Sequence, residues 1–150
     1  YLGANEEIVK QTAKLQGQST SNPTSISQMA SITALNDTEA DIRRMVNEFQ
    51  KRRDILLSSL LKIPSVECYK PVGSFYTFPD FSAFYGKSFK GKKVENSIQL
   101  ANFLLEEGKV ALVPGIAFGA DRNLRLSFAA SMDTIQQGVN RITKALEQLD

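Results

Sequence analysis

The sequence predicts an α/β protein in which a mostly helical first third is followed by a small mixed sheet covered by helices. Apolar residues recur with helical spacing through nearly all of residues 1–62. Short alternating or aromatic segments, typical of strands, follow between residues 66 and 128. A length of 150 residues, with 42% hydrophobic and 23% charged residues, fits one globular domain or a small domain joined to part of another.

Two short helices are expected at the start of the chain. Asn5 is a good N-cap for a helix that continues to about Gln16, and Gly17 should end it. Asn22–Pro23 has the pattern of an N-cap followed by proline in the first helical position, so a second helix should continue to about Leu35.

A third, longer helix should follow and should carry the domain boundary. Asp37 or Thr38 can cap it, and Pro64 should stop it. The change from helical to strand-like pattern places the boundary near residue 50, inside this helix. We therefore expect one domain to contain residues 1–50 and a second to contain residues 51–150.

The second domain should alternate short strands with helices around one small sheet. In chain order, the expected elements are strands at 66–69 and 74–78, a loop at 80–95, a helix from Asn96 or Ser97 to Gly108, strands at 110–113 and 123–128, and a last helix capped by Ser131.

Composition excludes several classes of protein and site. A net charge of +2 without a one-signed stripe argues against nucleic-acid or membrane-surface binding, and no apolar run approaches the length that spans a bilayer. The lone Cys68 cannot form an internal disulfide and favours a reducing compartment, here the cytoplasm. Without histidine there is no serine–histidine or cysteine–histidine catalysis, and no metal site is expected.

Arg125 is the sharpest single candidate for a binding residue. It lies in a strand between Leu124 and Leu126, so its side chain should project from the opposite face. A guanidinium on a rigid strand can bind a carboxylate through two parallel hydrogen bonds. From this spacing alone, a solvent-facing arginine in a surface ion pair is the more common outcome.

Three further segments have a functional and a purely structural interpretation. The loop Gln18–Asn22 brings hydroxyls to a helix N-terminus, which can bind an anion but can equally serve as a cap. The two glycines of 113–119 allow close approach of a ligand or simply a tight turn. The aromatic strand around Phe75 is core in most proteins.

Together these segments resemble the aspartate-aminotransferase-like group of class I aminotransferases, in the family's order and at its spacing. The matching segments are Tyr1-Leu2-Gly3, Gln18-Ser19-Thr20-Ser21-Asn22-Pro23-Thr24-Ser25, Pro71-Val72-Gly73-Ser74-Phe75-Tyr76-Thr77-Phe78-Pro79, Val113-Pro114-Gly115-Ile116-Ala117-Phe118-Gly119 and Leu124-Arg125-Leu126-Ser127-Phe128-Ala129.

The resemblance implies a fold-type I enzyme that uses pyridoxal phosphate to exchange an amino group between an amino acid, here aspartate, and 2-oxoglutarate. Arg125 matches the residue that grips the substrate α-carboxylate, and Phe75 lies where the family closes its small domain over substrate. Ser21 matches a loop that reaches the partner subunit's site in a homodimer, beside the substrate. Thr20 and Asn22 are implied near the cofactor.

Two departures from the family's pattern limit these expectations. None of the lysines has the context of the Schiff-base lysine, so no catalytic residue is assigned. Residues 1–50 are expected to be the end of the large cofactor-binding domain, and the chain alone is expected to be inactive. Gly17–Gln18 stands where some aspartate aminotransferases carry an arginine for the distal carboxylate.

Two other interpretations stay open at this point. One is another class I aminotransferase, acting on alanine, aromatic or other amino acids. The other is a non-catalytic α/β binding module that shares the fold.

Overall fold

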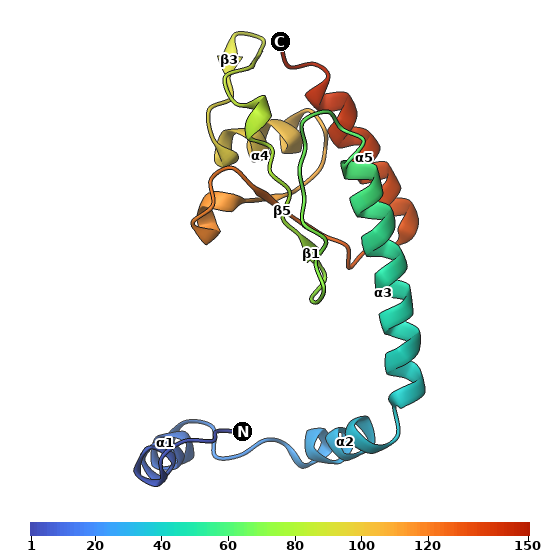
Figure 1. Ribbon diagram of the computed structural model, residues 1–150. Helices are drawn as coiled ribbons and strands as arrows, with labels where there is room; N and C mark the ends of the chain where they lie inside the picture. Colours follow the sequence, from blue (N-terminus) through green and yellow to red (C-terminus); the bar gives the residue numbers. More distant parts are fainter. The chain divides into compact units, whose positions relative to one another are not determined.

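The computed structural model describes residues 1–150 and divides them into two compact units, Tyr1–Arg44 and Met45–Asp150. The chain is drawn in Figure 1, coloured from blue at the N-terminus to red at the C-terminus. The division falls after Arg44, inside a helix and six residues before the boundary expected at residue 50. The assignment of residues 1–50 to a larger cofactor-binding domain stays a prediction.

The first unit contains two capped helices, both of them in the region predicted to be helical. Helix α1 (Glu6–Ser19) begins as expected, with the Asn5 side chain accepting a hydrogen bond from the Glu7 amide at 2.9 Å. It continues through Gly17, which therefore does not end it. Helix α2 (Ser25–Asn36) is capped by Thr24, so the prediction that Asn22 caps it was wrong.

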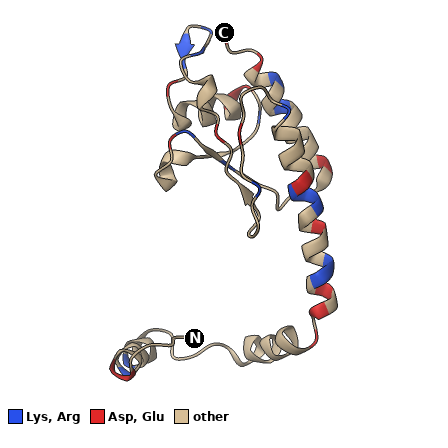
Figure 2. Cartoon of the chain, viewed as in Figure 1, with Lys and Arg blue, Asp and Glu red and all other residues tan.

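Helix α3 (Glu39–Leu60) begins in the first unit and ends in the second. Acidic and basic residues alternate along its surface (Figure 2), and i,i+3 and i,i+4 ion pairs such as Arg43–Glu39 hold side chains on the helix. Its buried residues are all near its C-terminal end: Leu56, Leu57 and Leu60. The apolar stripe is therefore covered only in the second unit.

The second unit is organised around a three-stranded sheet with the order β1-β5-β4. The strands are β1 (Tyr76–Thr77), β4 (Val113–Pro114) and β5 (Leu124–Ser127), and both pairings are antiparallel rather than mixed. The strand expected at 66–69 is only a single bridge between Glu67 and Asp80. The sheet is therefore smaller than the sequence suggests, but it occupies the predicted region.

A hairpin occupies the region that was expected to be a loop. Strands β2 (Ser88–Phe89) and β3 (Lys92–Lys93) pair antiparallel. The turn between them has positive φ at Lys90 and Gly91, 48° and 77°, which is the backbone twist that tight hairpins need. A short 3-10 helix, η1 (Ser82–Phe84), precedes it.

Two helices complete the second unit, and both have the predicted caps. Asn96 caps α4 (Ser97–Glu106), and Ser131 caps α5 (Met132–Leu146). Their apolar faces and the end of α3 enclose one hydrophobic core against the sheet, which includes Leu60, Phe81, Leu100, Leu104, Leu124, Phe128 and Ile142. The fold class is confirmed: a helical first third, then a small sheet covered by helices. No helix is long and apolar enough to cross a bilayer.

Candidate functional site

Arg125 lies at the centre of the sheet, in the middle strand β5. Leu124 and Leu126 are 0% and 4% exposed, so they occupy the core face. Because side chains alternate along a strand, Arg125 must point to the other face, where it is half-buried. The structure therefore confirms the predicted orientation of the Arg125 side chain.

Two aromatic rings contact the Arg125 guanidinium. Its central carbon lies 4.4 Å from the centre of the Tyr76 ring and 4.7 Å from the centre of the Phe118 ring. Both distances are within the roughly 6 Å at which a cation is attracted to the face of a ring.

Strand pairing explains the first of these contacts. Tyr76 is directly opposite Ser127, and Ser127 is two residues beyond Arg125 on the same face of β5. Tyr76 and Arg125 are therefore diagonal neighbours across the strand pair, a separation that aromatic and long side chains can bridge.

The second contact comes from the turn on the other side of β5. Val113 of β4 pairs with Arg125, and the chain then enters the 3-10 helix η2 (Gly115–Phe118). Phe118 at the end of η2 also packs edge-on against Phe78, with ring centres 5.9 Å apart. The two rings around the guanidinium therefore come from opposite neighbours of the central strand.

Backbone hydrogen bonds close the turn that carries Phe118. The Gly115 amide donates to the Asn123 carbonyl at 2.8 Å, and the Ala120 amide donates to the Gly115 carbonyl at 3.0 Å. A Cβ at Gly115 would lie only 2.1 Å from the Ala120 carbonyl oxygen. The glycine thus serves the tight turn, one of its two predicted interpretations.

A polar network also ties this turn to helix α4. The buried Ser97 hydroxyl donates to the Asp121 carboxylate at 2.6 Å and accepts from the Ile116 amide at 3.2 Å. The Tyr85 hydroxyl donates to the Asp121 backbone carbonyl, and burial raises the pKa of Tyr85 to about 12, so it remains a donor. The network holds the turn, and with it Phe118.

Arg125 has no carboxylate beside it, unlike Arg122 next to the sheet and Arg53 in helix α3. Arg122 forms an ion pair with Asp80 at 2.9 Å, and Arg53 forms one with Asp54 at 2.9 Å. Arg125 has neither an ion pair nor a side-chain hydrogen bond, and only the two rings contact its charge. A half-buried guanidinium whose N–H donors are unused is a suitable group for an incoming anion.

Phe75 lies beside the Arg125 site because its ring packs against that of Tyr76. Its ring lies 4.3 Å from that of Tyr76 and is 41% exposed, while its carbonyl accepts a hydrogen bond from the Phe128 amide. The sequence predicts Phe75 as a site residue but not Tyr76 and Phe118, whose rings contact Arg125 directly. Both lie in segments that carried the resemblance, yet only the strand order shows that they meet.

Thr20, Ser21 and Asn22 lie in the first unit, in the exposed loop after α1. The Thr20 hydroxyl accepts a hydrogen bond from the Gln16 side chain, and Ser21 has a left-handed φ of 62°. No lysine or arginine occurs from residue 15 to residue 38. These neutral donors can contribute hydrogen bonds to a phosphate, but its charge must be balanced by other residues.

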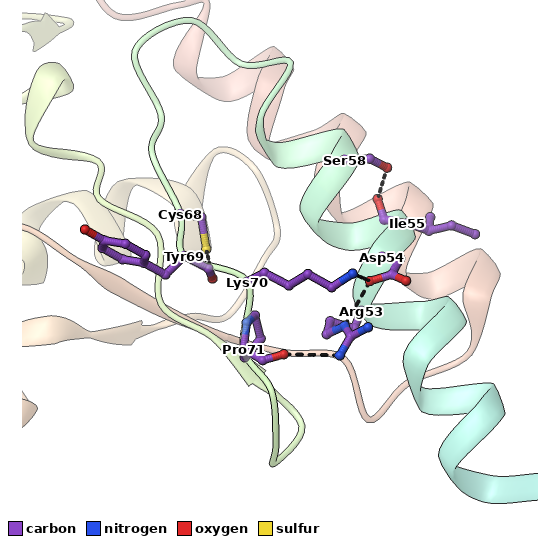
Figure 3. Close-up of polar contacts among 8 residues, drawn as sticks. All are labelled: Arg53, Asp54, Ile55, Ser58, Cys68, Tyr69, Lys70 and Pro71. Atoms are coloured by element: carbon purple, nitrogen blue, oxygen red, sulfur yellow. Dashed lines mark hydrogen bonds and ion pairs between the residues drawn. The ribbon is translucent and has the colours of Figure 1, made fainter. Parts of the chain in front are cut away.

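A second polar cluster ties the segment before Phe75 to helix α3 (Figure 3). Arg53 donates to the Pro71 carbonyl at 3.2 Å, and the Asp54 carboxylate bridges Arg53 and Lys70. The hydrogen bond from Arg53, followed by that from Lys70, lowers the pKa of Asp54. Burial raises the pKa of the nearby Cys68 thiol, so it is a poor nucleophile and not a candidate catalytic residue.

The fold and the unpaired arginine define an α/β domain that presents a half-buried guanidinium, without an acidic partner, at the middle strand of its sheet. The family model for aminotransferases of class I and II matches residues 1–142. The chain belongs to this family.

Named relatives agree over nearly the whole chain. It is 45% identical over 150 residues to a protein of Rickettsia typhi named "Probable aspartate/prephenate aminotransferase", with 99% of this chain and 38% of that protein covered. The crystal structure of the aspartate aminotransferase from Rhizobium meliloti superposes with a TM-score of 0.94 at 37% identity, covering 99% of this chain and 37% of that one. An aromatic aminotransferase from Pyrococcus horikoshii superposes at 0.85 with 26% identity, covering 97% and 38%. The chain thus spans under two fifths of the length of these relatives.

Proposed function

We propose that this chain supplies the residue that binds the substrate carboxylate in a pyridoxal-phosphate-dependent aminotransferase. The enzyme acts on aspartate and 2-oxoglutarate. The observation that carries the proposal is the state of Arg125: half-buried, held by two rings and without an acidic partner. Amino acid and 2-oxo acid substrates share an α-carboxylate, which is the group a guanidinium fork binds best.

Each residue of this chain has a limited role in the proposal. Arg125 donates two parallel hydrogen bonds to the α-carboxylate and so fixes the orientation of the adjacent carbon. Phe75 covers the substrate from the side of β1 and excludes water when the small domain closes. Ser21 contacts the substrate's distal group in the partner's site of a homodimer.

Two other residues of the first unit are assigned to the cofactor. Thr20 and Asn22 are placed beside its phosphate, to which they can donate hydrogen bonds without charge. Pyridoxal phosphate, when bound, supplies the electron sink that amino-group transfer needs. The chain's own contribution is binding and orientation, and the lone unpaired Cys68 supports a cytoplasmic setting.

A second candidate substrate class deserves equal testing, because no basic residue lies in the segment that should meet a distal carboxylate. An aromatic or other amino acid would not need one. A relative named as an aromatic aminotransferase, with its TM-score of 0.85, supports this alternative. If the substrate is aspartate, Ser21 can donate a hydrogen bond to the second carboxylate, but the charge of that carboxylate must be balanced by a basic residue outside positions 15–38.

The test uses the full-length protein loaded with pyridoxal phosphate and a panel of amino acids with 2-oxoglutarate. We expect aspartate to be the best donor, and Arg125→Ala to lower kcat/KM by about 100-fold or more, since it removes a bidentate charged contact. Arg122→Ala is the matched control because its partner is Asp80. An unchanged kcat/KM in Arg125→Ala would refute the role of Arg125. We expect no transamination from the 150-residue chain alone.

A further inference from the structure

We propose that Tyr76 and Phe118 are positioning residues that fix the plane of the Arg125 guanidinium, so that its N–H edge rather than its face meets the substrate carboxylate. The inference rests on the proposed role of Arg125 and adds two residues to it. Neither ring touches the carboxylate in this account. Both act through the arginine.

The two rings reach Arg125 from different elements of the sheet region. The two ring centres are 4.4 and 4.7 Å from the guanidinium carbon, and the rings come from β1 and η2, on opposite sides of β5. They do not pair with each other: Tyr76 packs against Phe75 and Phe118 packs against Phe78. The two rings therefore contact the guanidinium from opposite neighbours of β5, and neither contact uses an N–H donor of the guanidinium.

The two rings take the place of an acidic partner for Arg125. Proteins usually fix an arginine with a carboxylate, as Asp80 fixes Arg122. A carboxylate beside Arg125 would compete with the substrate for the same N–H donors. Aromatic faces attract the cation without supplying a competing acceptor, so they can hold Arg125 while leaving its binding edge free.

The two rings also restrict the Arg125 side chain before substrate binds. A free arginine side chain loses rotamer entropy when it binds, and holding it in place beforehand moves that cost out of the binding step. The rings can do this because they are themselves held. Tyr76 is fixed by strand pairing with Ser127, and Phe118 by the turn in which Gly115 bonds to Asn123.

The principal experiment compares ring-removing and ring-keeping variants of the full-length, cofactor-loaded enzyme. We expect Tyr76→Leu and Phe118→Leu each to raise the KM for the amino acid on the order of tenfold, from the loss of one cation–π contact and of preorganisation. We expect kcat to change much less. Tyr76→Phe keeps the ring and should restore the wild-type KM. Tyr69→Leu removes an exposed tyrosine that contacts no cation and is the control.

A second measurement does not depend on whether the variants fold. In the wild-type 150-residue chain, ring currents from the Tyr76 and Phe118 rings should shift the NMR signal of the Arg125 Nε–H group upfield of that of an unstacked arginine without a hydrogen-bond acceptor. A signal at the position of an unstacked arginine would overturn the proposal.

The outcomes separate this inference from the proposed function. If Arg125→Ala abolishes activity while Tyr76→Leu and Phe118→Leu leave KM within about twofold, the rings do not position the arginine and only the present inference fails. If Arg125→Ala leaves KM unchanged, the proposed function fails and the inference falls with it. A KM rise in Tyr76→Phe equal to that in Tyr76→Leu would assign the effect to the hydroxyl and would also overturn the inference.

Discussion

Helices in both units have good N-terminal caps, but only the helices of the second unit bury residues in a core. Helices α1 and α2 of the first unit have good caps and no buried residue. Helices α4 and α5 of the second unit bury an apolar face in a shared core. Local signals are therefore sufficient to define all four helices, but only the second unit has the tertiary packing from which most helix stability comes.

The apolar residues of the first unit show the same contrast. Ile26, Met29, Ile32 and Leu35 of α2 are between 53% and 86% exposed. Exposed apolar surface of this kind indicates a surface that packs against another part of a protein. We therefore expect the second unit to be stable by itself and the first to depend on contacts beyond these two helices.

The largest expected difference between the units comes from removing one leucine in each. Leu60 is fully buried and Leu35 is 86% exposed. Leu60→Ala should destabilise the second unit by about 2–5 kcal/mol, because it leaves a cavity. Leu35→Ala should change stability by less than ~0.5 kcal/mol. Urea unfolding followed by circular dichroism measures both, and equal losses would contradict the comparison.

A pair of glycine substitutions tests the same contrast in the backbone. A Cβ at Gly115 would collide with two carbonyl oxygens, whereas one at Gly17 would meet nothing within 4 Å. Gly115→Ala should cost roughly 3 kcal/mol of the second unit's stability. Gly17→Ala should favour α1 by about 1 kcal/mol, since alanine is the better helix former. The midpoint of the second unit's urea transition should not move in Gly17→Ala, and a clear shift would show that the units are coupled.

A smaller effect is expected at a defect inside the core. Thr77 is 1% exposed, and its hydroxyl has no hydrogen-bond partner. Thr77→Val should therefore stabilise the second unit by about 1 kcal/mol, because a buried unsatisfied hydroxyl is costly. Thr77→Ser keeps the hydroxyl, loses a methyl group and should destabilise. A lower thermal midpoint for Thr77→Val than for the wild type would indicate that the hydroxyl has a partner.

The smallest effect concerns Asp54, on the part of α3 that belongs to the second unit. Its folded-state pKa is lowered by Arg53 and then by Lys70. A lowered pKa means that the ionised form is favoured on folding, so its contribution is present above the ordinary pKa and is lost as the pH falls through the folded value. An NMR titration of the Asp54 carboxyl should show the low pKa rising in Lys70→Ala. No rise would assign the shift to Arg53 alone.

The features that sequence predicted well depend on neighbours in the chain. The caps Asn5, Asn96 and Ser131 act within three residues of themselves, and the alternation around Arg125 is a property of one strand. Where two local signals competed, the prediction failed: Thr24 rather than Asn22 caps α2. Both residues are good caps, and only the folded backbone decides between them.

The features that sequence could not predict depend on which strands pair with one another. Tyr76 meets Arg125 because β1 pairs with β5, about 50 positions further along the chain, whereas Phe118 is brought back to Arg125 by the turn between β4 and β5. The hairpin at 88–93 was missed because Lys90-Gly91 is a weaker turn signal than Asn-Gly. The roles of Arg125, Phe75, Thr20, Ser21 and Asn22 stay predictions until the full-length enzyme is assayed.

Residue-resolved hydrogen exchange of the 150-residue chain tests most directly whether only residues 45–150 have a core of their own. We expect the amides of α4 and α5 to exchange at least ~10³-fold more slowly than unstructured amides, and those of α1 and α2 to exchange close to the unstructured rate. Equal protection in α1 and α5 would show that the first unit is stabilised within this chain, and it would contradict the account.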